Sequence, residues 1–145
     1  MPLYQAHAKK NSDDILGTYK IISTKYGIDR AITKAYKDKK GRYYFILTKV
    51  ITKDGIENIT KCQKCKGIFK DKPVEGMVIV WNLKPKASNP YEFESGYGIS
   101  PWSGRMFRGD LKLSNSKRII GIKAYPLETQ MVSRKFHFIR MDDKN

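Results

Sequence analysis

The chain has 145 residues and a formal net charge of +15, with 29 Lys and Arg against 14 Asp and Glu. This length suits one domain with a single core, and a content of 40% hydrophobic and 12% aromatic residues argues against a disordered chain. No apolar run reaches the roughly 20 residues of a membrane-spanning helix, so we expect no membrane span.

The first residues differ in character from the rest. Residues 1–13 are polar and predict a flexible leader, whereas residues 14–145 predict one folded domain. Residues 6–8 (Ala-His-Ala) have the small-x-small form that precedes signal-peptidase sites, and we hypothesise that they are the remnant of a truncated signal peptide. Asp13–Leu16 predicts a single helical turn where the domain begins.

Short β-rich runs and turn residues then alternate regularly. The clearest strand is Arg42–Thr52, where Tyr43, Phe45 and Leu47 occupy every second position, and Asp54-Gly55 ends it. The expected strands are residues 19–26, 29–37, 42–52, 78–83, 91–99, 105–113, 119–125 and 136–140. Several short strands at such spacing predict an all-β fold, either an antiparallel barrel or a sandwich.

Residues 53–73 predict a long irregular segment, which in a small domain is usually functional or tied down. The segment carries Cys62 and Cys65, the two cysteines of the chain. In an exported protein this pair would form a local disulfide that shapes the loop, and in a reducing cytosol it would remain two thiols. A zinc site needs four ligands, and only the distant His7 and His137 could complete it, so we expect no metal.

Catalytic patterns are missing from the sequence. No nucleophile elbow, Walker loop or Rossmann glycine pattern occurs, and the acidic pairs Asp13-Asp14 and Asp142-Asp143 are expected to be solvated. His137 lies between two phenylalanines, so strand alternation directs it to the face opposite to theirs. We therefore expect neither enzymatic activity nor a cofactor.

Strand alternation also predicts which side chains point inward. These are Tyr43, Phe45, Phe107, Leu111, Ile120, Ile122, Phe136 and Phe138, with Trp102, Leu127 and Met131 expected at the mouth. The inward set would either fill a small barrel completely or line a cavity for an apolar ligand, which eight-stranded barrels are just wide enough to hold. A register slip of one residue would reverse every assignment.

Four features of the sequence resemble a bacterial family of small exported, lipocalin-like proteins of uncharacterised function. Gly17-Thr18-Tyr19 stands where such barrels have Gly-x-Trp on the first strand. The Cys62-x-x-Cys65-x-Gly67 loop and the KDKP and GM sequences after it resemble the middle segment of that family. Residues 98–113 resemble its Gly-x-Ile-x-x-Pro-x-x-Gly region, and Arg140 its closing arginine.

The resemblance implies an up-and-down barrel of about eight strands that is exported to the periplasm or secreted; separately, we expect a monomer. The resemblance also implies a small apolar or amphipathic, fatty-acid-like ligand inside the barrel. In lipocalins the first-strand tryptophan closes the base and packs under the last-strand arginine. Tyr19 replaces that tryptophan here, and its ring can accept Arg140 through a cation–π contact.

The positive charge leaves other functions open. A basic Greek-key barrel could bind single-stranded nucleic acid by stacking bases on exposed aromatics such as Tyr36 and Tyr44, with an affinity that falls steeply with salt. A barrel with a solid core could instead adhere to anionic lipid or polysaccharide. Export argues against nucleic acid as the partner, and the scattered lysines also fit ordinary solvated strand faces.

Overall fold

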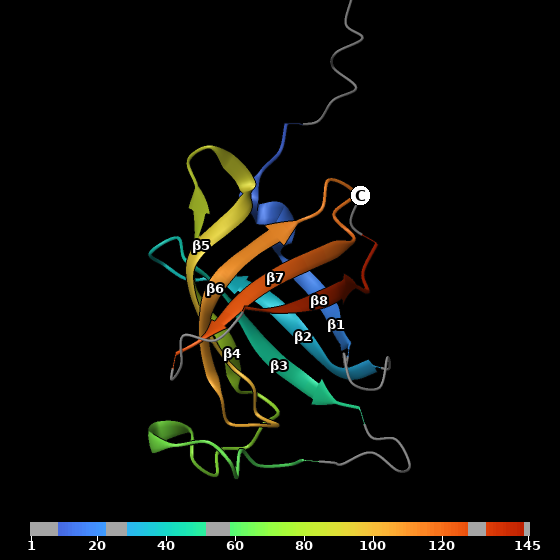
Figure 1. Ribbon diagram of the computed structural model, residues 1–145. Coiled ribbons are helices and arrows are strands. Elements are labelled where there is room, and N and C mark those ends of the chain that lie inside the picture. Colours follow the sequence, from blue (N-terminus) through green and yellow to red (C-terminus); the bar gives the residue numbers. More distant parts are fainter. Residues whose placement is uncertain (1–8, 23–28, 52–58, 128–132, 144–145) are drawn as a thin grey trace, which may run out of the picture.

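The computed structural model describes residues 9–22, 29–51, 59–127 and 133–143, and in them eight antiparallel strands form a closed barrel (Figure 1). Each strand pairs with its neighbours in sequence, and β1 closes the barrel by pairing with β8. The strands are β1 Gly17–Ile22, β2 Asp29–Lys37, β3 Tyr43–Val50, β4 Val78–Lys86, β5 Asn89–Ile99, β6 Met106–Leu113, β7 Ile119–Pro126 and β8 Arg134–Arg140. The expected up-and-down barrel is confirmed, and the sandwich alternative is wrong.

Two short 3-10 helices complete the described secondary structure, η2 (Ser12–Ile15) before β1 and η3 (Gly67–Phe69) between β3 and β4. The first is the helical turn expected at the start of the domain. Asn11 caps it, because its side chain accepts a hydrogen bond from the Asp13 amide at 2.8 Å. Neither these helices nor any other in the described residues is long and apolar enough to cross a membrane.

The β4–β5 hairpin is longer than the sequence suggested. The expected strands are residues 78–83 and 91–99, whereas β4 runs to Lys86 and β5 begins at Asn89, so that Pro85 and Pro90 both lie within strands although proline cannot donate to a β-ladder. Pro85 pairs with Phe93 of β5, whereas the register of β4 with β3 extends only to Leu83. Beyond Leu83, β4 is therefore an edge strand on its β3 side, where a missing amide hydrogen is tolerated.

Aromatic side chains fill the end of the barrel next to η2. Tyr43 and Phe45, alternate residues of β3, are at most 1% exposed. Tyr43 packs edge-on against Phe93 with ring centroids 5.3 Å apart, and Phe45 packs in the same way against Phe138 at 5.4 Å. Such pairs add roughly 0.5–1.5 kcal/mol each to the burial of their area. This end of the barrel is consequently solid, and we call it the base.

The guanidinium of Arg140 holds the base together. Its side chain is fully buried and donates hydrogen bonds to the backbone carbonyls of Asp14 (2.5 Å), Leu16 (3.1 Å) and Lys117 (2.6 Å). These carbonyls belong to η2, to the residue before β1 and to the turn before β7. One side chain of β8 thus links two segments that are distant in sequence, the stretch from η2 to the start of β1 and the turn before β7.

Tyr19 and Asp142 complete the surroundings of this guanidinium. Arg140 lies over the Tyr19 ring, 4.7 Å from its centroid, and also donates to the Tyr19 hydroxyl and to Asp142 Oδ1 at 2.9 Å. Gly17 has a φ of 148°, and a Cβ there would lie 2.3 Å from Arg140 Nη1. The glycine of the Gly-x-Tyr sequence is therefore required by the buried arginine.

Three buried tyrosines couple the base to pH. Tyr91 donates to Asp14 at 2.5 Å, Tyr43 donates to Asp13, and both carboxylates are half-buried rather than merely solvated. Burial, the hydrogen bond to Asp14 and the charge of Asp14, in that order, raise the pKa of Tyr91 to about 12. Burial likewise raises the pKa of Tyr19 and of Tyr43.

Replacing Arg140 by lysine should destabilise the barrel. Lysine keeps the charge but has one nitrogen in place of a planar fork with five donors, so buried carbonyls lose partners at about 1–3 kcal/mol each. We expect Arg140→Lys to lower the free energy of unfolding, measured by urea titration, by roughly 2–4 kcal/mol. Arg105→Lys, at an exposed arginine, is the control and should stay within about 0.5 kcal/mol of wild type. Equal stabilities of the two variants would contradict this account.

Stability should also decline in alkaline solution. Tyrosines ionise near pH 10 in the unfolded chain, and the raised pKa values keep them protonated in the fold. The unfolded state then binds fewer protons, so stability falls as pH rises from about 10 through the folded pKa values. Thermal unfolding of Tyr91→Phe between about pH 9 and 12 should show a shallower decline than wild type. Tyr97→Phe, at a tyrosine that is 41% exposed, is the matched control and should keep the wild-type slope.

Candidate ligand-binding cavity

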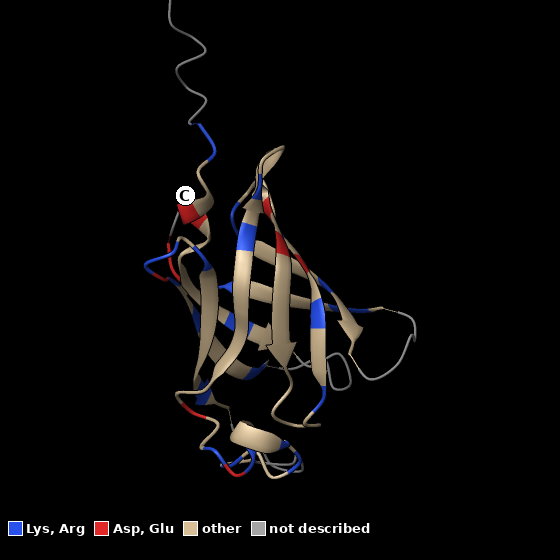
Figure 2. Ribbon diagram, turned by 90° about the vertical axis from the view of Figure 1, so that its left-hand side faces the viewer, with Lys and Arg blue, Asp and Glu red and all other residues tan. Residues whose placement is uncertain are grey.

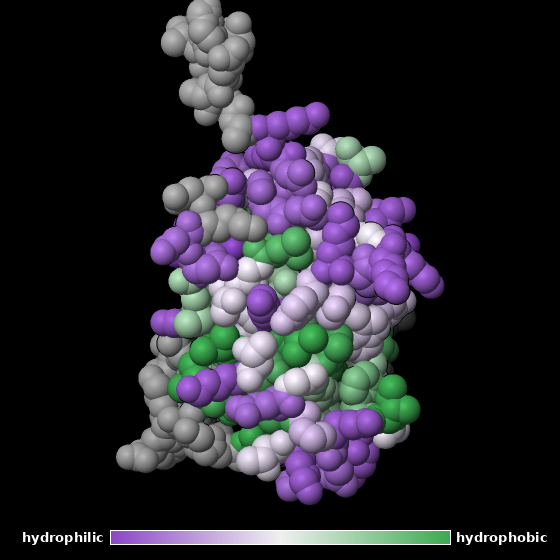
Figure 3. Space-filling view, turned by 180° about the vertical axis from the view of Figure 1, so that it is seen from behind, coloured by the Kyte–Doolittle hydropathy of each residue, from purple (hydrophilic) through white to green (hydrophobic). Residues whose placement is uncertain are grey.

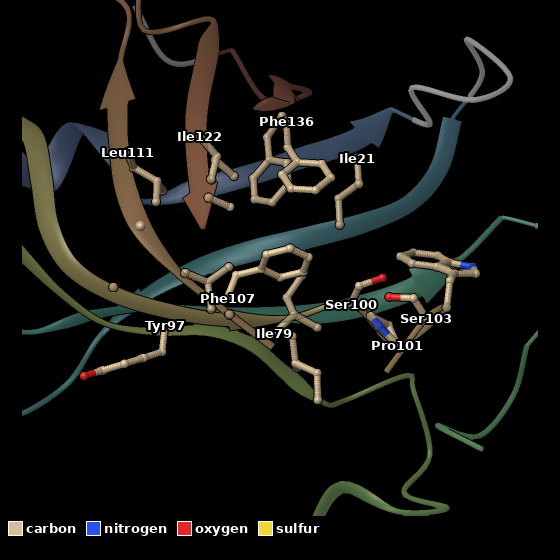
Figure 4. A pocket seen from close by; sticks show the side chains of 18 of the residues that line it. Ile21, Ile79, Tyr97, Ser100, Pro101, Ser103, Phe107, Leu111, Ile122 and Phe136 are labelled. Carbon is tan, nitrogen blue, oxygen red and sulfur yellow. The ribbon is translucent and has the colours of Figure 1, made fainter. Parts of the chain in front are cut away.

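The half of the barrel away from the base encloses a cavity of about 400 Å³. Strands on opposite sides of the barrel contribute its walls, as does the β5–β6 loop, residues 100–105 (Figure 4). The apolar side chains that line it include Ile21, Ile79, Phe107, Leu111, Ile122, Phe136 and Phe138. Phe107 and Phe136 meet edge-on across it with ring centroids 5.9 Å apart, so the interior surface is largely hydrocarbon.

Small residues form part of the cavity wall. Gly98 of β5, Gly109 of β6 and Ala124 of β7 all line it, beside larger side chains such as Phe107 and Phe136. Gly109 also permits close strand contact, since a Cβ there would lie 2.2 Å from the carbonyl oxygen of Lys123. The barrel thus has a filled half and a hollow half.

A few polar groups lie at one side of this hydrocarbon surface. The guanidinium of Arg30, on β2, stands over the Trp102 ring at 4.6 Å from its centroid, and both residues line the cavity. The Trp102 Nε1 atom is buried and has no hydrogen-bond partner among the described residues. Ser100 and Ser103 lie on the same loop as Trp102 (Figure 4). This cluster presents hydrogen-bond donors beside an apolar interior.

The structure places the eight residues that were expected to face inward in two groups. Phe107, Leu111, Ile122, Phe136 and Phe138 line the cavity. Tyr43, Phe45 and Ile120 are instead buried in the solid core, so the structure does not bring them to the cavity. His137 is exposed on the outer face, as alternation predicts.

Of the three residues expected at the mouth, the structure describes Trp102 and Leu127. Trp102 lines the cavity, whereas Leu127 is 44% exposed and does not line it. Met131 lies outside the described residues. Sequence reasoning missed Arg30, because nothing in the pattern of β2 shows which loop its first residues would meet.

The cysteines belong to residues 59–77, which we call the stapled segment. Cys62 and Cys65 form a disulfide and pack with Val74, Met77 and Ile99 in a second, smaller core. This core lies against the loop that walls the cavity, since Cys62 Sγ is 3.7 Å from the carbonyl oxygen of Pro101. The stapled segment therefore supports the cavity wall from outside.

Gly104 permits this contact. Its φ is 74°, and a Cβ on it would lie 2.0 Å from the carbonyl oxygen of Lys64 and 2.9 Å from the amide nitrogen of Cys65. Only a residue without a side chain allows the loop and the stapled segment to approach so closely. The Ser-Gly sequence of this loop is thus explained by packing.

The described residues contain no group of three or more His, Cys, Asp or Glu side chains placed to hold a metal ion. Cys62 and Cys65 are engaged in their disulfide, and His137 is exposed on the barrel exterior. The chemistry that this arrangement offers is therefore burial of an apolar group with hydrogen bonding at one side.

Comparison with known proteins supports the fold. No family model matches the sequence, and no curated protein matches it. Among solved structures, a protein from the human pathogen Helicobacter pylori, described as belonging to the lipocalin family, superposes with a TM-score of 0.69. The two sequences are 13% identical, and the match covers 89% of this chain and 84% of that chain. At this identity the likeness establishes a lipocalin-like barrel fold.

Gly104→Ala should loosen the stapled segment from the cavity wall. The variant suffers both the positive φ, at roughly 1–2 kcal/mol, and a backbone clash that only displacement can relieve. Gly41→Ala is the matched control, because Gly41 has a φ of 82° but nothing within 4 Å of its Cβ position. We expect Gly104→Ala to lose at least about 1 kcal/mol more than Gly41→Ala in urea unfolding. Equal losses would show that the close approach is unimportant.

Proposed function

We propose that this chain is a carrier that binds a small apolar or amphipathic molecule inside its barrel. The cavity of about 400 Å³ with hydrocarbon walls carries this proposal, and its volume lies in the roughly 300–1,000 Å³ range of ligand pockets. Burying apolar ligand surface there contributes about 25 cal/mol per Å² removed from water. Hydrocarbon walls suit retention of a ligand better than proton transfer, which supports binding without catalysis.

The polar cluster at the side of the cavity favours an amphipathic ligand with an acidic head group. The guanidinium of Arg30 is a charged donor in the cavity lining, where it stands over the Trp102 ring. A carboxylate accepts charge-assisted hydrogen bonds from a guanidinium, while an alkyl chain lies along the apolar walls that include Phe107 and Phe136. We therefore propose a fatty-acid-like ligand with its carboxylate towards Arg30.

Export to the periplasm or the cell exterior is part of the same proposal. The Cys62–Cys65 disulfide supports it, because disulfides persist mainly in oxidising compartments. Nucleic-acid binding is less well supported. Tyr36 and Tyr44 stack on each other with ring centroids 5.5 Å apart, which occupies one face of each ring that a base would need.

Binding of cis-parinaric acid, a naturally fluorescent fatty acid, tests the proposal. The wild-type protein should enhance its fluorescence saturably, and Ala124→Phe, which fills the cavity, should weaken binding by about tenfold or more. Ala87→Phe, the same enlargement at an exposed turn residue, is the matched control and should bind as wild type does. Leu111→Trp provides a second filling variant in case Ala124→Phe does not fold.

Head-group recognition is the second arm of this experiment. Arg30→Gln should weaken direct binding of cis-parinaric acid, whose carboxylate loses its partner, while the dissociation constant of an alcohol of similar chain length, obtained by displacement and corrected for the affinity of the probe, should stay unchanged. Mass spectrometry of solvent extracts from natively purified protein should recover a lipid. Saturable binding that is the same in both filling variants, or no binding together with repeatedly empty extracts, would overturn the proposal.

A further inference from the structure

The stapled segment exposes an isoleucine at its apex. Ile68 is 79% exposed, whereas the other large hydrophobic residues on the described surface are 41–44% exposed. It is the central residue of η3, at the end of the molecule opposite to η2 (Figure 1). Single exposed hydrophobic residues are common on protein surfaces. Whether Ile68 marks an interaction surface therefore depends on the residues around it.

Those surroundings are strongly basic. Every lysine of the stapled segment is exposed, and these are Lys61, Lys64, Lys66, Lys70 and Lys72. The two carboxylates of the segment are engaged, since Glu75 accepts from the Val50 amide at 2.9 Å and Asp71 lies 4.0 Å from Lys70 Nζ. Basic loops accordingly surround η3 at the lower end of the barrel (Figure 2).

The backbone holds this apex in one shape. Besides the disulfide, the Asp71 amide donates to the Cys62 carbonyl at 3.1 Å, and the Cys62 amide donates to the Lys72 carbonyl at 2.8 Å. Phe69 turns towards the barrel and stacks on Trp81 with ring centroids 5.8 Å apart. Ile68 is thereby directed away from the core while its neighbour is anchored in it, and the tip is ordered before it meets a partner.

We propose that this tip docks on the surface of an anionic lipid bilayer. The isoleucine would enter the boundary between head groups and acyl chains, and the surrounding lysines would pair with lipid phosphates. Stable attachment to a membrane surface needs both an apolar and an electrostatic contribution, and this segment supplies both within a few residues. An aliphatic apex offers no ring on which bases or sugars could stack, so a bilayer fits better than nucleic acid or polysaccharide.

The space-filling view agrees with such a contact. Seen from behind, the lower part of the molecule carries hydrophobic surface next to hydrophilic side chains (Figure 3). The stapled segment also touches the cavity wall through Gly104, which lies against Lys64 and Cys65. One consequence rests on the proposed function: docking would bring the ligand cavity close to the lipids from which a ligand could be taken.

Co-sedimentation with lipid vesicles tests the docking surface. The protein should bind vesicles of mixed phosphatidylcholine and phosphatidylglycerol, bind phosphatidylcholine alone weakly, and lose affinity as salt rises. Ile68→Ser should weaken binding by about tenfold. Ile119→Ser, the same change at a 41% exposed isoleucine near the base, is the matched control and should bind within about twofold of wild type.

The charged part has its own pair of variants. Lys64→Gln with Lys66→Gln should weaken vesicle binding by about tenfold, whereas Lys39→Gln with Lys40→Gln, on the exposed β2–β3 turn, should not. Equal losses in both pairs would show diffuse charge attraction and overturn the proposal. So would wild-type binding by Ile68→Ser, or binding to a single-stranded oligonucleotide or to heparin without binding to vesicles.

Probe binding separates this proposal from the preceding one. Ile68 and the four substituted lysines do not line the cavity; these lysines are Lys39, Lys40, Lys64 and Lys66. All of these variants should therefore retain wild-type affinity for cis-parinaric acid in the absence of vesicles. Vesicle binding without probe binding would support the docking surface and contradict the proposal that the chain is a carrier. Probe binding without vesicle binding would do the reverse.

Discussion

The buried Arg140 guanidinium is the interaction on which the barrel depends, because it closes one end of the cylinder. It takes hydrogen-bond acceptors from η2, from the residue before β1 and from the turn before β7, and its flat face rests on Tyr19. A buried charge is tolerated only when its donors are satisfied, and here the backbone provides most of the acceptors. Gly17 has no side chain because the guanidinium occupies that space.

A closed base makes the other half of the barrel available for a ligand. Apolar side chains cannot line a cavity at both ends of so small a barrel and still provide a core. In this barrel, large side chains fill one end, and several small residues line the other. Rings such as Phe45 and Phe93 fill the base, while Gly98, Gly109 and Ala124 line the opposite half. The solid core and the cavity thus occupy different parts of the same strands.

Most of the fold could be predicted because its signals are local. Alternation within single strands predicted inward side chains such as Phe45 and Phe107, which are buried in the structure. The length of the β4–β5 hairpin was not predicted, since sequence does not show that β4 loses its β3 partner beyond Leu83. The cavity is not a local property. It requires Gly98, Gly109 and Ala124 to meet across three strands, and the Arg30–Trp102 contact joins a strand to a distant loop.

The disulfide shows how a small covalent ring can matter without adding much stability. A loop closed over three residues removes little chain entropy, yet it fixes the backbone on which two contacts depend. On one side the ring lies against Gly104 and the cavity wall, and on the other it holds Ile68 outward among lysines. Elsewhere the described surface exposes no large apolar side chain to this extent. The net charge of +15 therefore indicates an interaction surface only at the stapled segment, where exposed lysines surround an exposed isoleucine.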